Sequence, residues 1–273
     1  MKPPNHRTPP EGVTPGSTIQ QAFDHIYRNA VWGKNSQGSG TSGSGSTFQS
    51  TLIYRTFLQQ FLKDNGIRSV VDAGCGDWQF SQTLDWSGID YRGFDIVESV
   101  ITENKRKFAR PNIQFFAGNI FELDLPPADL LISKHVLQHL PIRDVLAFMP
   151  QVAKFKHVLL TNGVTHKTLS GRNEDIVTGE GRTLDPTAPP FNLEGVKALT
   201  YWDGVHMHQV VHIHHAVRNE GEARARITAR GYINVNELKR SDQGFWMGMA
   251  QKDARVVHVA VDAKGNVFFR DPS

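Results

Sequence analysis

The chain has 273 residues, 39% of them hydrophobic and 21% charged, which suits one large globular domain with additions. Its formal net charge is +3 and no block of Lys and Arg stands out, so a nucleic-acid partner is not expected. The single cysteine, Cys75, excludes an intrachain disulfide, and no run of about 18 apolar residues would cross a membrane. We therefore expect a cytoplasmic protein without a nucleic-acid or membrane partner.

The first 66 residues divide into a tail and a helical cap. Residues 1–16 carry five prolines and few large apolar side chains, which predicts a disordered tail. Residues 17–66 are expected to form an N-terminal helical cap, whose first helix begins with capping-box spacing at Ser17-Thr-Ile-Gln20 and whose second begins at Phe48. Between them, NSQGSGTSGSGST at 35–47 has the composition of a flexible linker, but its N–H groups and hydroxyls could equally close over a ligand.

From Arg68 onward, short apolar runs alternate with helical stretches. Strands are expected at 69–73, 91–96, 113–117, 129–133, 157–162, 233–239 and 245–251. Helices are expected at 79–86, 98–109, 135–140, 142–155 and 222–230. This order predicts an α/β fold with a Rossmann-like, mostly parallel seven-stranded sheet and helices on both faces. Ligands of such sheets bind beyond the carboxyl ends of the strands.

Two later stretches interrupt or end this pattern. Residues 165–204 are polar and rich in Gly and Pro, and we predict a lid-like insertion over a substrate. His208, His212 and His215 would share one face of a helix, but without Cys or a nearby carboxylate they do not predict a metal site, and no metal is expected. Residues 253–273 are expected to form a C-terminal β-hairpin.

The stretch VVDAGCGDW at 70–78 predicts a strand followed by a tight glycine turn that can hold a small ligand. A dinucleotide site requires a third glycine, but Gln79 stands there, and Asp77 at the start of the next helix would repel a pyrophosphate. The carboxylates of Asp72 and Asp77 suit a ligand with a cationic amino group, such as S-adenosylmethionine. A nicotinamide dehydrogenase stays the second cofactor class.

Two further strand ends fit the rest of that ligand. Asp95 follows Asp72 by 23 positions, close to the spacing at which an acidic residue meets ribose hydroxyls. Asn119 and Ile120 follow the third strand, where an amide and an apolar side chain could address the edge and the face of an adenine.

The successive motifs VVDAGCGDW, GFDI, FFAGNIF and DLLISKHVLQHLP resemble those of class I S-adenosylmethionine-dependent methyltransferases. The resemblance covers roughly 70–251, including Gly231-Tyr232 before the antiparallel strand pair that ends the family's sheet, and predicts a cofactor-binding methyltransferase domain at 67–252. Trp32-Gly33 with the Gly/Ser stretch, and TAPPFN at 187–192, resemble a bacterial subgroup of small-molecule or glycan-tailoring methyltransferases.

The resemblance also implies the site. Asp72 or Asp77 would hold the ammonium group, Asp95 the ribose, and Ser133 and Lys134 would flank the methionine end next to the acceptor. The implied cofactor-binding set is Asp72, Gly74, Gly76, Asp77, Asp95, Ile96, Asn119, Ile120, Ser133, Lys134 and Trp32. His135 is the first catalytic candidate, as a base or a polar contact, and His139 is the second, with a structural hydrogen bond as its competing interpretation.

Methyl transfer to an oxygen or nitrogen of a small molecule in biosynthesis is therefore the main functional hypothesis. A nucleic-acid amino-methyltransferase would be expected to show Asn/Asp-Pro-Pro-aromatic after the fourth strand, where this chain has Ser133-Lys-His135-Val. An enzyme that cyclises or cleaves the aminobutyryl arm of S-adenosylmethionine and a non-catalytic binding protein would both keep the same motifs. A homodimer is left open.

Overall fold

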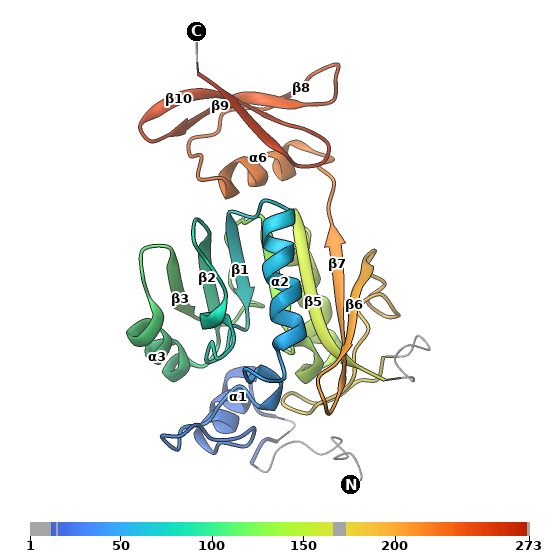
Figure 1. The fold of residues 1–273 in the computed structure, drawn as a ribbon. Coiled ribbons are helices and arrows are strands. Elements are labelled where there is room, and N and C mark those ends of the chain that lie inside the picture. The colour runs from blue at the N-terminus through green and yellow to red at the C-terminus, as the bar shows by residue number, and fades with distance from the viewer. Residues whose placement is uncertain (1–11, 15, 166–172, 272–273) are drawn as a thin grey trace.

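The computed structural model describes residues 12–14, 16–165 and 173–271. Its centre is a seven-stranded sheet of order β3-β2-β1-β4-β5-β7-β6 (Figure 1). The strands are β1 (Ser69–Ala73), β2 (Asp90–Asp95), β3 (Ile113–Ala117), β4 (Leu130–Lys134), β5 (His157–Val164), β6 (Val196–Trp202) and β7 (Met207–His214). The first five are parallel and β7 runs antiparallel to both β5 and β6, which confirms the predicted Rossmann-like, mostly parallel sheet.

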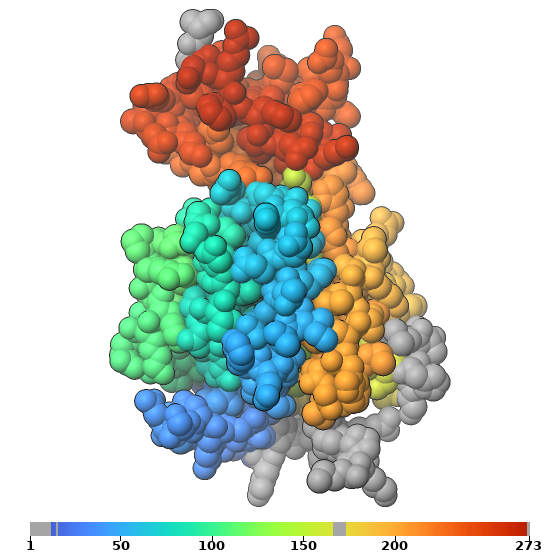
Figure 2. Space-filling view, in the orientation of Figure 1, coloured from blue at the N-terminus to red at the C-terminus, as the bar shows by residue number. Residues whose placement is uncertain are grey.

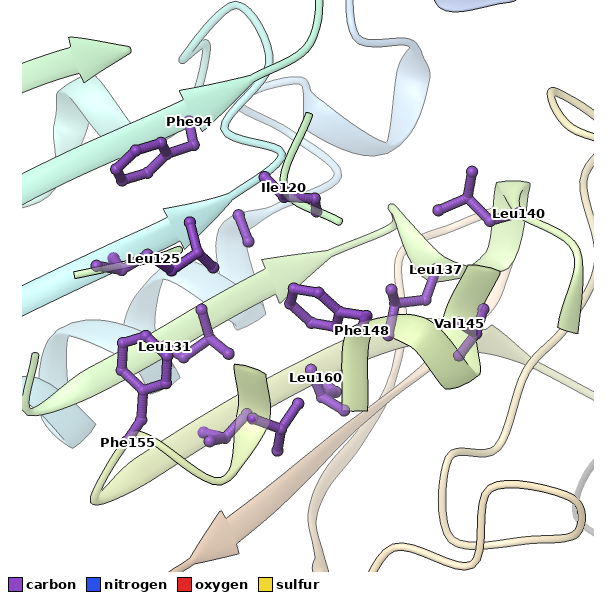
Figure 3. Packing of buried hydrophobic residues seen from close by; sticks show 14 of the residues in the cluster. Phe94, Ile120, Leu125, Leu131, Leu137, Leu140, Val145, Phe148, Phe155 and Leu160 are labelled. Atoms are coloured by element: carbon purple, nitrogen blue, oxygen red, sulfur yellow. The ribbon is translucent and has the colours of Figure 1, made fainter. Parts of the chain in front are cut away.

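Helices cover both faces of the sheet because successive strand residues point to opposite sides. Val71 and Leu131 share one apolar cluster with α4 (Ile142–Val152), whereas Val70 and Leu130 share another with α2 (Leu52–Asp64). The helix α3 (Glu98–Phe108) contributes to both clusters. Figure 3 shows the α4 side, where Phe148 lies over the sheet among Leu131, Leu137 and Leu160. Each such fully buried side chain contributes about 1.5–3 kcal/mol to the free energy of folding.

The N-terminal helix α1 (Ile19–Arg28) lies at the carboxyl edge of the parallel strands (Figure 1). Its capping box is formed by Thr18 and Gln21, one residue later than predicted. Phe23, Ile26 and Tyr27 are buried on its inner side. Residues 1–11 and 15 of the predicted disordered tail lie outside the described residues, and Val13 is buried.

The prediction of a helix at 79–86, after the glycine turn, is wrong. Only a short 3-10 turn, Ser81–Thr83, forms in that stretch. Trp78 has a positive φ of 57° and its buried ring contacts the rings of Tyr91, Phe108 and Phe115. Burial of this aromatic side chain holds the backbone in a non-helical course. The stretch 135–140 likewise contains only a 3-10 turn, Leu137–His139.

The last two strands of the main sheet are also not where the sequence predicted them. The expected helical His stretch is strand β7, and the expected strands at 233–239 and 245–251 are not in this sheet. On a strand, His208 and His212 share a face with buried Val210, while His215 follows the strand end, so the helical grouping of three His does not exist. Among the described residues no group of three or more His, Cys, Asp or Glu could hold a metal ion.

A second, four-stranded sheet follows, in the order β11-β10-β9-β8. Its strands are β8 (Lys239–Arg240), β9 (Trp246–Lys252), β10 (Arg255–Val261) and β11 (Val267–Arg270), preceded by α6 (Glu220–Ala229). The predicted hairpin is confirmed as β10 and β11, but the predicted domain boundary at 252 falls inside this sheet. The sheet forms a lobe at the amino ends of the parallel strands (Figure 2), joined by an Arg230–Asp129 ion pair at 3.2 Å.

The described part of the predicted insertion packs onto the body of the protein. Leu184 and Phe191 belong to the α4-side cluster, and the Asp185 carboxylate pairs with Lys197 at 2.8 Å. The strand β6 forms its end. A role over a substrate stays a prediction. Across 12–14, 16–165 and 173–271, no helix has the length and apolar character needed to span a bilayer.

Candidate active site

A pocket of about 790 Å³, part of it open to solvent, lies at the carboxyl edge of the parallel strands. Its floor comes from the ends of β1, β2 and β4 and from the loop after β3. Its roof comes from α1 and the Gly/Ser stretch, and we call residues 19–46 the roof. Of the predicted cofactor residues, those that line the pocket are Trp32, Asp72, Gly74, Gly76, Asp95, Ile96, Asn119, Ile120 and Lys134.

The glycine turn is tied to β2 through Asp95. The backbone N–H of Gly76 donates to Oδ2 of Asp95 at 2.9 Å, and the N–H of Val97 donates to Oδ1 at 3.0 Å. Gly74 and Gly76 have φ values of 85° and 55°, which only glycine adopts without strain. Burial raises the pKa of Asp95, and the two N–H donors oppose that shift. The carboxylate has lone pairs left for a ligand hydroxyl.

The Gly/Ser stretch closes over this turn, so its interpretation as a solvated linker is wrong. Ser42 Oγ donates to Asp77 Oδ1 at 2.6 Å and accepts from the N–H of Asp77 at 2.9 Å. The Tyr27 hydroxyl lies 2.7 Å from the same Ser42 oxygen. Further along, Gly45 O accepts a 2.7 Å hydrogen bond from Lys134. The roof is thereby attached to both the β1 and β4 ends.

The two carboxylates proposed for a ligand ammonium group differ in position. Asp72 lines the pocket and accepts a 2.6 Å hydrogen bond from the Tyr91 hydroxyl, and its burial raises its pKa to about 7. Asp77 is not among the lining residues, and its oxygens accept hydrogen bonds from Ser42 and Gln79. Of the two carboxylates, Asp72 is therefore the one that faces the pocket.

Apolar side chains and one amide form the other end of the pocket. Ile96, Ile120 and Phe121 line it, and Phe121 was not foreseen from the sequence. Asn119 also lines it, but its amide nitrogen donates to Glu122 and its oxygen accepts from the N–H of Phe121. Asn119 thus shapes the turn after β3 and has one amide hydrogen and one lone pair left for a ligand.

Lys134 and His135 mark the end of β4. Lys134 Nζ lies 3.2 Å from His135 Nδ1, and both residues line the pocket. Burial lowers the pKa of Lys134 to about 7 and lowers the pKa of His135 well below its ordinary value, so the imidazole stays neutral. His135 has a φ of 57°, a backbone strain of the kind that is concentrated at functional sites. Ser133 is buried behind the pocket, where its hydroxyl donates to Ala73 O at 3.1 Å.

Residues 70–159, from β1 through the first part of β5, match the family described as a methyltransferase domain. Residues 70–159 therefore form a methyltransferase domain. The matched residues contain the glycine turn, Asp95, Asn119 and the Lys134–His135 pair. No curated protein matches the sequence.

Solved methyltransferase structures resemble this one at low sequence identity. Magnesium protoporphyrin IX methyltransferase of Synechocystis PCC 6803 with bound S-adenosylmethionine aligns with a TM-score of 0.49 at 15% identity, over 73% of this chain and 98% of the other. The N-methyltransferase NodS of Bradyrhizobium japonicum WM9 aligns at 0.47 and 13%, over 60% and 87%. Human N-acetylserotonin methyltransferase aligns at 0.45 and 19%, over 73% and 60%.

His139 lies outside the pocket of the methyltransferase domain. Its Nδ1–H donates to Glu180 O at 2.9 Å, and its ring lies 4.8 Å from that of Trp32. Trp32 lines the pocket and contacts Phe23 and Tyr27 edge-on. These contacts favour the structural interpretation of His139, which supports the roof through Trp32.

Arg182 was not identified from the sequence, because it lies in the irregular stretch before β6, where no motif marks it. Its backbone N–H donates to Gln138 O at 3.1 Å, beside the turn that carries His139. None of its three guanidinium nitrogens has a hydrogen-bond partner among the described residues, although all three are buried. Burial lowers the pKa of Arg182 to about 10, and only Asp175 opposes this.

Proposed function

We propose that this protein transfers the methyl group of S-adenosylmethionine to an oxygen or nitrogen of a small molecule. One observation carries the proposal: a single pocket joins the apolar end at Ile120, the carboxylates of Asp95 and Asp72, and the Lys134–His135 pair. These are the contacts required by an adenine, a ribose, an amino-acid arm and a methyl acceptor, in the order in which they would follow one another.

The donor set fits this cofactor. Ile96, Ile120 and Phe121 offer an apolar surface to an adenine ring, and Asp95 offers free lone pairs to ribose hydroxyls. Asp72 offers a buried carboxylate to an ammonium group, which would restore its ionised form by bringing an opposite charge. Bound S-adenosylmethionine would supply an activated methyl group on a positively charged sulfur.

The chain's own contribution is alignment, exclusion of water and proton transfer. In-line displacement requires the acceptor atom to be held close to the methyl carbon, and the roof covers the pocket on that side. Lys134 faces the same pocket with a pKa of about 7, so its amine can take a proton from the acceptor near neutral pH. His135 stays neutral and can accept a hydrogen bond.

The side chains that line the pocket on the roof side support a small acceptor. Trp32, Phe23 and Tyr27 restrict the pocket on the α1 side, and Ser42 and Ser46 restrict it on the Gly/Ser side. The acceptor class is therefore a compound small enough to enter beside Lys134.

The test is calorimetry of the purified protein with S-adenosylmethionine and S-adenosylhomocysteine, followed by a product assay on candidate extracts. We expect both ligands to bind and S-adenosylhomocysteine to accumulate only when an extract is present. Failure of both ligands to bind would refute the proposal. Methylthioadenosine as the product would instead identify an enzyme that consumes the aminobutyryl arm, and binding without any turnover would identify a binding protein.

A further inference from the structure

A series of polar side chains in contact with one another leads from the pocket to the turn between β6 and β7. Lys134 Nζ lies 3.2 Å from His135 Nδ1, and His135 Nε2 lies 3.0 Å from Nδ1 of His208 on β7. His208 Nε2 lies 2.8 Å from Oδ2 of Asp203, and the side chains of these last two residues are 6% and 5% exposed. Three contacts thus connect the pocket to a buried carboxylate.

The chemistry of the two ends fixes the direction of these hydrogen bonds. Asp203 Oδ1 accepts from the backbone N–H groups of Val205 and His206 at 2.8 and 2.7 Å. Burial by itself raises the pKa of Asp203, but these two donors and His208 outweigh it and lower the pKa overall. Asp203 is thus an ionised acceptor, so His208 carries its proton on Nε2 and offers Nδ1 as an acceptor.

The same reasoning continues to the pocket. Because His208 Nδ1 accepts, His135 must carry its proton on Nε2, which leaves its Nδ1 free to accept from Lys134. Lys134 donates its other hydrogen bond to Gly45 O of the roof. In each of the three contacts a donor therefore faces an acceptor, and all three hydrogen bonds point from Lys134 toward Asp203.

We infer that Lys134, His135, His208 and Asp203 form a proton relay that removes the acceptor's proton from the pocket. The inference rests on the proposed methyl transfer. As the acceptor attacks the methyl group, its N–H or O–H bond breaks and the proton bonds to Lys134 Nζ. Lys134 passes a proton to His135 Nδ1, and His135 releases its Nε2 proton to His208 Nδ1. Lys134 and His135 end neutral, and the charge rests on His208 beside Asp203.

Other groups around the relay determine where that charge is stable. Burial holds the pKa of His208 below its ordinary value overall; Asp203 opposes that effect, whereas Lys134 and His206 reinforce it. Tyr201 packs against His208 with ring centroids 5.1 Å apart, and burial raises the pKa of that phenol to about 13, so it stays neutral. The Asp203 carboxylate is therefore the group that favours a proton on His208.

The same strand contributes to a second pair of histidines, which lacks these features. His212 shares the face of His208 on β7, and its Nε2 lies 3.0 Å from Nδ1 of His157. No described carboxylate is hydrogen-bonded to this pair, and neither residue lines the pocket. A His–His contact alone is thus a feature of the fold, and the addition of Asp203 and Lys134 distinguishes the relay.

The test is the tautomeric state of the histidines in the full-length protein, read from long-range ¹H–¹⁵N correlation spectra after ¹⁵N-histidine labelling. Signals are assigned from single His→Gln variants. In the wild type we expect Nε2–H tautomers for both His135 and His208. As the pH is lowered, His208 should gain its second proton before His135. An Nδ1–H tautomer of His135, or protonation of His135 first, would overturn the relay.

Asp203→Asn gives a sharper result. Its oxygen must stay under the N–H groups of Val205 and His206, so the amide nitrogen would face His208 Nε2 as a donor. Both His208 and His135 should then change to Nδ1–H tautomers, whereas His212→Gln should leave both unchanged. Unchanged tautomers in Asp203→Asn would refute the relay. The spectra need no methyl donor, so they are independent of whether S-adenosylmethionine binds.

Discussion

The Ser42 hydroxyl donates a 2.6 Å hydrogen bond to the Asp77 carboxylate, which joins the Gly/Ser stretch to the glycine turn of β1. This contact spans 35 residues of sequence and places the roof directly against the backbone that would carry the cofactor's amino-acid arm. It also engages the Asp77 carboxylate, which the sequence analysis had assigned to the ligand's ammonium group. The roof and the turn should therefore respond together to substitutions on either side.

Gly76→Ala should weaken S-adenosylmethionine binding at least tenfold, or about 1.4 kcal/mol. An added Cβ would lie 2.2 Å from Ser42 Oγ, at a φ of 55°, so the roof would have to move. Gly38→Ala is the matched control, because its φ is 83° and its Cβ would meet nothing within 4 Å. Calorimetry measures the S-adenosylmethionine affinity of both variants. Gly76→Ala combines the clash with backbone strain, whereas Gly38→Ala introduces the strain alone. Equal affinities would contradict the role of the roof contact.

Asp95→Ala should reduce cofactor affinity by about 1–3 kcal/mol, because it leaves polar partners unpaired. The same change removes the acceptor for the N–H groups of Gly76 and Val97, so thermal stability should fall as well. Asp90→Ala, at the exposed start of β2, serves as the control. An unchanged Kd with a lowered Tm would restrict Asp95 to a structural role.

His135→Ala should lower kcat more than it raises the Kd for S-adenosylmethionine, since the residue lies on the β4 side of the pocket next to Lys134. A loss of about 10²-fold is the order expected for a group that assists proton transfer. The product assay and calorimetry measure the two effects separately. A larger effect on Kd than on kcat would remove His135 from the acceptor side.

Lys134 should make the free energy of unfolding depend on pH. Its pKa is about 7 when folded and near 10.5 when unfolded, so between these values the unfolded chain binds more protons. The Lys134 contribution to stability therefore rises as the pH increases from about 7 toward 10.5. The free energies of unfolding of the wild type and Lys134→Met are measured in urea at pH 7 and 9. Between these two pH values the free energy of unfolding should rise more for the wild type than for the variant. A constant difference would disprove the lowered pKa.

Arg182→Met should stabilise the protein. A buried cation without a hydrogen-bond partner among the described residues costs free energy, and an apolar side chain of similar length removes that cost. A gain of about 1 kcal/mol would raise Tm by roughly 2–4 °C in a domain of this size. Arg143→Met, with a side chain 80% exposed, should leave Tm unchanged. A lower Tm for Arg182→Met would show that the guanidinium is satisfied in solution.

The sequence predicted most of what depends on local pattern. The runs at 69–73 and 113–117 became strands with the same bounds because β-branched and aromatic residues between turn signals are legible in a short window. Gly74, Gly76 and Asp95 could be placed together because carboxyl ends of neighbouring parallel strands meet at one edge.

What failed depends on contacts distant in sequence. The stretch 207–214 is a strand only because β5 and β6 pair with it on either side, which places His208, His212 and His214 on one face together with Val210. The buried ring of Trp78 prevents a helix that local propensity favoured. His135 and His208 are 73 residues apart, and no spacing rule indicates that their rings meet.

The pocket and the C-terminal lobe lie at opposite edges of the main sheet. The pocket opens at the carboxyl edge, and the C-terminal lobe attaches at the amino edge through Arg230–Asp129 and through Ser69 Oγ, which donates to Ala229 O at 3.0 Å. Immobilising the protein on a sensor chip through this lobe would leave the pocket facing the solution. Binding kinetics of cofactor and extract fractions could then be measured without obstructing the roof.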